Sequence, residues 1–116
     1  MTTVLIVDDH AGFRGTARAL LESEGFEVVG EAADGAAAIE AARSLRPEVI
    51  LLDVYLPDVN GFEVAARLTT NGPAPAIVMI SSRDARDFGP LVEESGARGF
   101  IPKAELSGTT LSALLQ

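Results

Sequence analysis

The sequence predicts an α/β protein in which one parallel sheet is covered by helices on both faces. Short apolar runs alternate along the chain with stretches whose apolar residues recur at helical spacing, a pattern typical of parallel strands joined by crossover helices. The run at 48–52 is nearly all apolar, as expected for a strand buried on both faces. The chain has 116 residues, of which 47% are hydrophobic, so it can build a sizeable core. We therefore expect one domain over residues 1–116.

The first half of the chain contains three predicted strands, at 4–7, 26–32 and 48–52. A helix is expected between the first two. Its apolar face consists of Phe13, Ala17, Leu20 and Leu21. This helix should end near Gly25, because glycine commonly terminates helices. Asp34 can cap a second helix over 35–45, which Pro47 cannot continue.

The second half contains two further predicted strands, at 76–80 and 99–102. Turn residues at 56–61 precede a helix that we expect over 62–70. The Asn71-Gly72-Pro73 sequence should interrupt the regular secondary structure after that helix. Ser107 can cap a last helix that ends near Leu115.

The stretch from Ser82 to Gly96 has the least regular pattern. A helix could start at 83–87, but the Gly89-Pro90 pair lies inside it. Proline is tolerated in the first turn of a helix and breaks its interior. We therefore expect an irregular lead-in followed by a short helix over 90–95.

Polar residues follow four of the five predicted strands, at the point where each strand ends. They are Asp8-Asp9, Asp53, Ser81-Ser82 and Lys103. Each alone could be a helix cap, a turn residue or a solvated strand end. In an open parallel sheet, however, the carboxyl ends of the strands face a common crevice. The fold would thus gather three carboxylates, a hydroxyl and an ammonium, a cluster suited to a divalent cation and a phosphoryl group.

Composition excludes several classes of function. The net charge of −8 argues against direct binding of nucleic acid, which requires a basic face. No apolar run approaches the roughly 20 residues of a membrane helix, and the amino terminus does not resemble a signal peptide. The absence of cysteine fits a reducing cytoplasm. Lys103 is the only lysine beside eight arginines, which hints at a need for a compact ammonium.

Taken together, the motifs resemble those of the receiver domains of two-component response regulators. They are Val-Asp-Asp-His at 7–10, Leu-Leu-Asp-Val-Tyr-Leu-Pro-Asp-Val-Asn-Gly at 51–61, Ser81-Ser82, and Gly-Phe-Ile-Pro-Lys at 99–103. The resemblance covers essentially the whole chain. It implies a doubly wound, flavodoxin-like (βα)5 fold with five parallel strands in the order 2-1-3-4-5. The switch point of such a sheet lies between its first and third strands.

The resemblance also implies a metal site and a phosphoacceptor. Asp53 is similar to the phosphoacceptor, and Asp8 and Asp9 to the acidic pair that binds Mg²⁺, for which Mn²⁺ could substitute. We expect Asp9 to ligate the metal directly and Asp8 through water, with Asp53 and the backbone carbonyl of Tyr55 completing the protein ligands. These assignments agree with chemistry, because Mg²⁺ takes a few carboxylates and bridges to phosphate. The only histidine, His10, is interpreted as a helix-entry residue.

Further roles follow from the same resemblance. Ser81 and Lys103 would contact the phosphoryl oxygens, and Ser81 and Phe100 would move together as a switch. Tyr55 and Arg83 occupy positions that flank the path of the attacking water, so we expect them to slow dephosphorylation.

Three features depart from the family pattern. Ala104 follows Lys103 where receivers commonly have proline, so a cis peptide bond is not expected there. The Gly89-Pro90 pair should weaken the fourth helix. Phe100 lacks a hydroxyl, so its switching must depend on packing.

The expected function is a phosphorylation-dependent signalling switch whose partner is a histidine kinase or phosphotransfer protein. The chain would promote only its own phosphorylation and dephosphorylation. A phosphatase-like aspartyl enzyme is a competing hypothesis, against which Tyr55 counts, since such enzymes usually have a second Asp at that position. A binding module that is never phosphorylated is a further hypothesis. A nucleotide- or flavin-binding protein is less favoured still, because residues 8–15 lack a glycine-rich loop.

The output of the switch is left open by the sequence. We expect a stand-alone cytoplasmic receiver that acts on a downstream protein, and a phosphorylation-dependent dimer is compatible with this role. The alternative is that the chain is the receiver part of a longer DNA-binding response regulator, with its own output domain.

Overall fold

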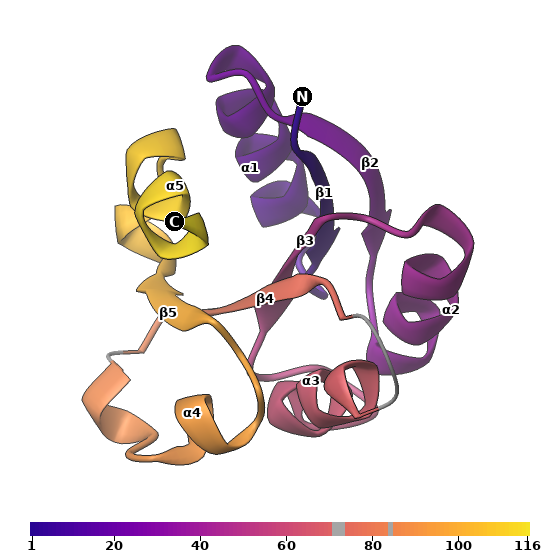
Figure 1. The fold of residues 1–116 in the computed structure, drawn as a ribbon, viewed down its shortest axis with the longest axis vertical. Coiled ribbons are helices and arrows are strands. Elements are labelled where there is room, and N and C mark those ends of the chain that lie inside the picture. Colours follow the sequence, from indigo (N-terminus) through magenta and orange to yellow (C-terminus); the bar gives the residue numbers. More distant parts are fainter. Residues whose placement is uncertain (71–73, 84) are drawn as a thin grey trace.

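The computed structural model describes residues 1–70, 74–83 and 85–116. It contains a parallel sheet in the order β2-β1-β3-β4-β5. The strands are β1 (Thr3–Val7), β2 (Glu27–Ala32), β3 (Val49–Asp53), β4 (Ala76–Ser81) and β5 (Gly99–Pro102). The helices are α1 (Ala11–Ser23), α2 (Gly35–Leu45), α3 (Gly61–Thr69), α4 (Leu91–Glu94) and α5 (Gly108–Leu115). The predicted doubly wound, flavodoxin-like fold and its strand order are thus confirmed (Figure 1).

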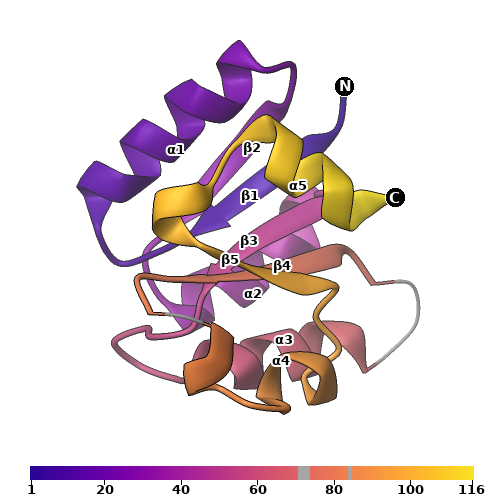
Figure 2. The same ribbon diagram turned by 90° about the vertical axis from the view of Figure 1, so that its left-hand side faces the viewer.

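Helices cover the sheet in two layers. Helices α1 and α5 lie on one face, and α2, α3 and α4 lie on the other (Figure 1 and Figure 2). Successive side chains of a strand point to opposite faces of the sheet and so pack with opposite layers of helices. In β1, Val4 and Ile6 pack with α1 and α5, whereas Leu5 and Val7 pack with α2 and α3. Strands β1 and β3 lie inside the sheet and are buried on both faces, as their apolar sequences require. Among the described residues, no helix has the length and apolar character needed to cross a membrane.

Local sequence signals set most of the helix boundaries. The side chain of Asp34 accepts a hydrogen bond from Ala37 N at 2.8 Å and caps α2 as predicted. Asn60 caps α3 in the same way through Phe62 N. Ser107 forms a capping box with Thr110 at the start of α5. These caps satisfy backbone N–H groups that would otherwise lack partners.

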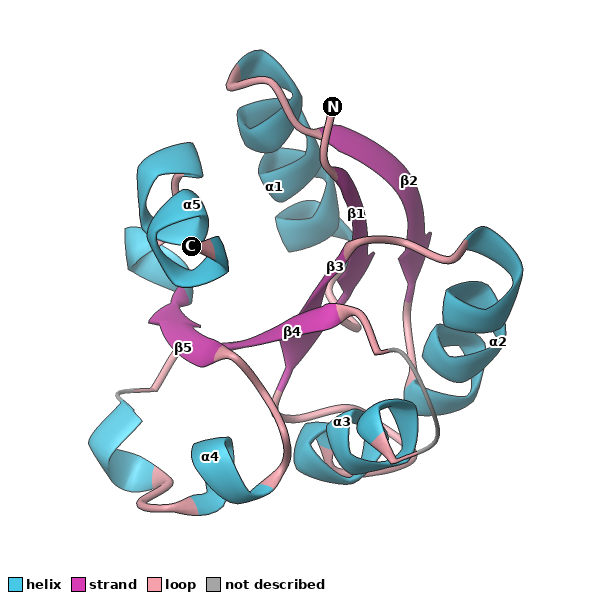
Figure 3. Cartoon of the chain, in the orientation of Figure 1, coloured by secondary structure: helices cyan, strands magenta, loops and turns pink. Residues whose placement is uncertain are grey.

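The segment after β4 is irregular, as the sequence indicated. A short 3-10 turn at Ala85–Asp87 precedes α4, which has four residues, a proline at its N-cap and no buried side chain. Figure 3 shows α4 as little more than one turn. The predicted break at Asn71-Gly72-Pro73 lies outside the described residues. No cis peptide bond occurs among the described residues, in agreement with the absence of proline after Lys103.

Candidate functional site

The acidic residues meet at the carboxyl edge of the sheet. Strands β1 and β3 are neighbours, with Val7 paired to Leu52, so Asp8 and Asp53 come next to one another. The Asp8 side chain is fully buried, and Asp53 is only 4% exposed. Asp9 follows at the mouth of the crevice and is exposed. The structure therefore brings together the three carboxylates that the strand ends predicted.

Lys103 reaches this cluster from the end of β5. Its Nζ lies 2.6 Å from Oδ2 of Asp8 and 3.2 Å from Oδ2 of Asp53. The same ammonium lies 4.7 Å from the centroid of the Phe13 ring, in the range of a cation–π contact. Burial alone would lower the pKa of Lys103, but its contacts with Asp8 and Asp53 outweigh burial and raise it. Lys103 is therefore held as a cation between two anions.

The surroundings of Asp53 disfavour its charged form, whereas those of Lys103 favour it. Burial raises the pKa of the Asp53 carboxyl, and the neighbouring charge of Asp8 raises it further. The hydrogen bond from Tyr55 N to Oδ1, at 3.2 Å, and the contact with Lys103 offset this only in part. The ionised crevice thus carries more negative charge than one lysine compensates, and a bound cation would relieve it.

The donor atoms suit a hard divalent cation. Asp8, Asp9, His10 and Asp53 each offer a ligand atom, and these atoms lie within 4.8 Å of one another. Oδ2 of Asp8 is buried and, apart from its ion pair with Lys103, has no hydrogen-bond partner. Carboxylate oxygens are the protein ligands that Mg²⁺ prefers. The residues present therefore fit Mg²⁺.

His10 contacts this acidic cluster, which its expected role as a helix-entry residue did not predict. Its Nδ1 is 3.2 Å from Oδ1 of Asp8 and 3.1 Å from Oδ1 of Asp9. His10 is also the N-cap residue of α1, without a capping side-chain hydrogen bond, so its role as a helix-entry residue stands. Its position directly after the acidic pair was the only available signal of the contact.

The loop after Asp53 packs tightly against it because residue 61 is glycine. Gly61 N donates to the carbonyl of Val54 at 2.7 Å. A Cβ at position 61 would lie 2.1 Å from the carbonyl oxygen of Asp53, much closer than two such atoms can approach. The turn predicted at 56–61 thus requires glycine at its end, and it fixes the backbone that carries Asp53.

The same loop is also fastened to α2. The carboxylate of Asp58 accepts hydrogen bonds from Gly35 N at 2.8 Å and from Ala36 N at 3.1 Å. These bonds, chiefly the one from Gly35, lower the pKa of Asp58. Sequence reasoning missed this second cap of α2 because its donors lie more than twenty residues away.

Arg14 supports the strand end that carries Asp8, and it was also missed. Its guanidinium donates to the backbone carbonyl of Asp8 at 2.6 Å and to Glu31 at 3.0 Å. Arg18 donates to the other oxygen of Glu31 at 2.7 Å. These contacts, led by that of Arg18, lower the pKa of Glu31. The network ties the β1–α1 connection to β2.

Ser81 and Phe100 lie on the β4–β5 side of the crevice. Ser81 is buried, and its Oγ accepts a hydrogen bond from Arg83 N at 3.1 Å. The Phe100 ring packs against Phe88, with centroids 5.5 Å apart. Phe88 in turn contacts Phe62 at 5.6 Å and Tyr55 at 6.0 Å. Phe88 is therefore the centre of the aromatic cluster, although the irregular sequence around it gave no sign of burial.

Tyr55 and Arg83 lie together at the outer side of this cluster. The Tyr55 side chain is half exposed, and Cζ of Arg83 is 5.4 Å from the centroid of its ring. The two residues that were predicted to flank the path of the attacking water are thus in contact through a cation–π geometry.

Comparison with known proteins agrees with this arrangement. The family model for the response regulator receiver domain matches residues 4–115. A putative transcriptional regulator of Pseudomonas aeruginosa is 40% identical over 114 residues, covering 97% of this chain and 55% of that protein. The transcription regulator BvgA of Bordetella pertussis is 38% identical over 102 residues, covering 88% of this chain and 49% of that protein. The chain thus spans about half the length of these relatives.

Solved receiver structures superpose along nearly the entire chain. The receiver domain of the putative response regulator NarL from Mycobacterium tuberculosis has a TM-score of 0.85 and 34% identity, with 98% of this chain and 96% of that chain covered. The chemotaxis response regulator CheY4 of Vibrio cholerae has a TM-score of 0.85 and 30% identity, with 100% and 97% covered. Sequence, fold and site agree that the chain belongs to the response regulator receiver domain family.

Proposed function

We propose that Asp53 accepts a phosphoryl group from a phosphohistidine of a histidine kinase or phosphotransfer protein. The observation that carries the proposal is the buried Asp53 carboxylate beside Asp8, with the Lys103 ammonium in contact with both. In the reaction, a carboxylate oxygen of Asp53 attacks phosphorus. A P–O bond forms, the P–N bond to the donor histidine breaks, and the imidazole leaves with the electron pair and takes up a proton.

The chain's own residues would orient and neutralise the transferred group. Asp8, Asp9 and Asp53 would hold Mg²⁺ or Mn²⁺ together with the backbone carbonyl of Tyr55, and the bound ion would supply charge neutralisation at the phosphoryl oxygens. Lys103 would turn from the carboxylates to a phosphoryl oxygen. Phosphoryl transfer depends mainly on such positioning and charge compensation, and we propose that the chain promotes only the formation and loss of its own acyl phosphate.

The response would begin at Ser81. The phosphoryl group offers acceptor oxygens to the Ser81 hydroxyl, which in this structure accepts from Arg83 N. Movement of Ser81 would release the backbone of Arg83 and make space for the Phe100 ring to repack against Phe88. Ser81→Ala should therefore still accept the phosphoryl group and show a reduced change of NMR shifts at Phe88 and Phe100.

Labelling by acetyl phosphate tests the acceptor without a kinase. With Mg²⁺, intact-protein mass spectrometry should show one added phosphoryl group per chain, and none in Asp53→Asn or in the presence of a chelator. Equal labelling of Asp53→Asn would refute the assignment. Repeated turnover of a phosphate ester would instead support a phosphatase-like enzyme.

The relatives support an output in gene regulation. The two curated relatives described above are named as transcription regulators and are about twice as long as the matched region. With a net charge of −8, the receiver itself is unsuited to DNA, so contact with DNA would fall to another segment or a partner protein. Such an output implies a location in the cytoplasm. Phosphorylation-dependent DNA binding by the native polypeptide, measured at matched salt concentration, tests this role.

A further inference from the structure

A groove of about 1220 Å³ runs between α2 and α3. Its apolar residues include Ile39 and Ala42 of α2 and Leu68 of α3. It extends past the end of α2 to Glu48, which directly precedes β3, whereas Asp53 ends that strand. The groove therefore reaches the end of the sheet opposite the acidic crevice.

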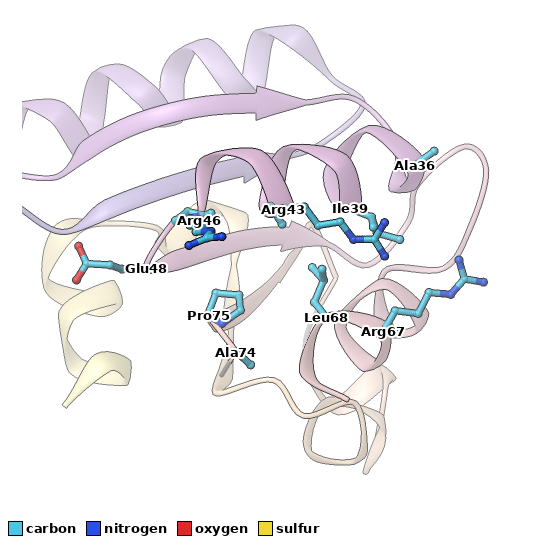
Figure 4. Close-up of a pocket in the computed structure, with 11 residues that line it drawn as sticks. Ala36, Ile39, Arg43, Arg46, Glu48, Arg67, Leu68, Ala74 and Pro75 are labelled. Carbon is cyan, nitrogen blue, oxygen red and sulfur yellow. The ribbon is translucent and has the colours of Figure 1, made fainter. Parts of the chain in front are cut away.

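Three of the eight arginines of the chain line this groove. Figure 4 shows Arg43 and Arg46 extending from α2 and the segment after it, Arg67 extending from α3, and Leu68 reaching toward α2 between them. Arg67 is paired with Glu63 at 3.7 Å, and both side chains are more than half exposed, so this pair contributes little. Among the described residues, no acidic side chain forms an ion pair with Arg43 or Arg46.

The one acidic residue of the lining does not neutralise these arginines. The Glu48 carboxylate accepts a hydrogen bond from Thr3 N at 3.1 Å, and Glu48 N donates to the Thr3 hydroxyl at 2.9 Å. Glu48 is thus directed to β1, and the groove presents an apolar floor with a positive rim. This is unusual in a chain whose net charge is −8.

The backbone conformation of Arg46 is a second observation that points to this groove. It ends α2 in the left-handed region with φ of 46°, and it is the only non-glycine residue among those described with a positive φ. Glycine or asparagine normally occupies this position, because a longer side chain is strained there. The chain tolerates this strain at a residue whose guanidinium lines the groove, and backbone strain of this kind is often associated with function.

We propose that the α2–α3 groove is a docking site for an acidic segment of a partner protein that also carries apolar side chains. Carboxylates of the partner would pair with Arg43, Arg46 and Arg67, and its apolar residues would cover Ile39, Ala42 and Leu68. The volume exceeds the roughly 300–1,000 Å³ of small-molecule pockets, which favours an extended segment over a single anion. An amphipathic helix with apolar residues at i, i+3, i+4 and i+7 suits a groove between two helices. The proposal does not depend on phosphorylation of Asp53.

Peptide titration of the 116-residue chain tests the proposal. The first probe is a fluorescein-labelled peptide with Leu at i, i+3, i+4 and i+7 and Glu elsewhere. A second probe replaces Leu with Ser, and a third replaces Glu with Lys. We expect measurable binding of the Leu/Glu peptide only, with weaker binding at high salt. NMR shift changes should fall on residues 36–48 and 66–70. No binding at millimolar concentration, equal binding of a control peptide, or shifts centred on Asp53 would overturn the proposal.

Arginine variants connect the binding to the groove. Arg43→Gln and Arg67→Gln should each raise the Kd about two- to fivefold, the effect of one exposed ion pair. Arg98→Gln removes the same charge from an exposed residue outside the groove and should leave the Kd unchanged. Arg46→Gly should weaken binding while the urea midpoint stays the same or rises, because glycine relieves the backbone strain. An Arg98→Gln effect equal to that of the groove variants would contradict the proposal.

The same variants test two other occupants of the groove, a nucleic acid and a second copy of the chain. Tighter, arginine-dependent binding of a single-stranded oligonucleotide would assign the groove to nucleic acid. Self-association in sedimentation equilibrium that is lost in Arg43→Gln would assign it to a second copy of the chain. Either result would overturn the proposal of an acidic peptide partner.

Discussion

Helices α3 and α4 follow neighbouring strands and lie on the same face of the sheet. They differ in their N-terminal caps and in the number of side chains that they bury. Helix α3 has a side-chain cap from Asn60 and four buried residues, starting with Gly61 and Phe62. Helix α4 has Pro90 at its N-cap, no capping side chain and no buried residue. It is connected to the core by Val92, which is partly buried, and by Phe88, which precedes the helix and is buried.

The difference suits the two tasks that we propose for Asp53 and Ser81. The segment after Asp53 is held by Gly61, by the Asp58 cap on α2 and by the core, so the backbone at Asp53 keeps its geometry. Of the described side chains between 82 and 96, those of Phe88 and Ser95 are buried, and we propose that a small change at Ser81 can shift this segment. Regions with few buried contacts open most easily. The following predictions test this contrast, from the largest effect to the smallest.

Gly61→Ala should be the most disruptive single change. The added Cβ would meet the Asp53 carbonyl at 2.1 Å, so we expect a loss of about 3 kcal/mol or more in the free energy of unfolding. Gly89→Ala, ahead of α4, is the matched control. No atom lies within 4 Å of its added Cβ, and only its φ of +57° is unfavourable, so the cost should be about 1 kcal/mol. Urea unfolding measures both, and equal losses would break the contrast.

Phe88→Ala should loosen α4 without disturbing the strand that carries Asp53. Removal of a buried ring that contacts three other aromatic rings should cost about 2–3 kcal/mol, at or below the low end for such truncations because the site is at the edge of the core. Hydrogen exchange should quicken over 91–98, while the strand residues 49–53 keep their protection. Faster exchange around Asp53 would show that the two segments are not independent.

Asp53→Asn should stabilise the metal-free protein at neutral pH. Burial, followed by the charge of Asp8, raises the pKa of Asp53 above the ordinary value of 3.8, so its ionised form opposes folding. The destabilisation is absent below the unfolded-state pKa and appears as the pH rises through the higher folded-state pKa. The gain in Asp53→Asn should thus be present at pH 7 and vanish in acid.

Chelator-treated samples unfolded in urea across this pH range provide the measurement. Asp9→Asn is the control, since Asp9 lies at the mouth of the crevice and is exposed, and it should change little. A gain in Asp53→Asn that does not depend on pH would exclude titration of Asp53 as its cause.

Tyr55 and Arg83 should have the smallest effects, and only on the lifetime of the acyl phosphate. Their contact would restrict the approach of a water molecule in line with the leaving carboxylate. Tyr55→Ala and Arg83→Ala should each speed decay in Mg²⁺ about threefold, the order of one exposed cation–π contact. Because the two side chains act as a pair, the double variant should decay no faster than Tyr55→Ala. Unchanged decay in both single variants would refute the shielding, and slower decay in Arg83→Ala would indicate transition-state stabilisation.

The sequence predicted those parts of the molecule whose causes are local. The apolar runs, the caps at Asp34 and Ser107 and the polar residues at strand ends depend on neighbours along the chain. Once the sheet was taken as parallel, the meeting of Asp8, Asp53 and Lys103 followed from topology.

The missed features depend on contacts between distant segments. The cap that Asp58 places on α2, the hold of Arg14 on the Asp8 carbonyl and the burial of Phe88 require the folded arrangement. No periodicity marks them, because each involves a single side chain in a loop or on a helix surface. The phosphoryl chemistry assigned to Asp53 and its neighbours stays a prediction that the labelling experiment tests.

The placement of Tyr55 gives this protein a built-in optical probe. It is the only tyrosine, and the chain has no tryptophan, so tyrosine fluorescence arises from a single ring two residues beyond Asp53. That ring contacts both Arg83 and Phe88, one on the solvent side and one in the core. Emission from the unlabelled chain, excited at a wavelength that tyrosine absorbs and phenylalanine does not, would therefore report events near Asp53.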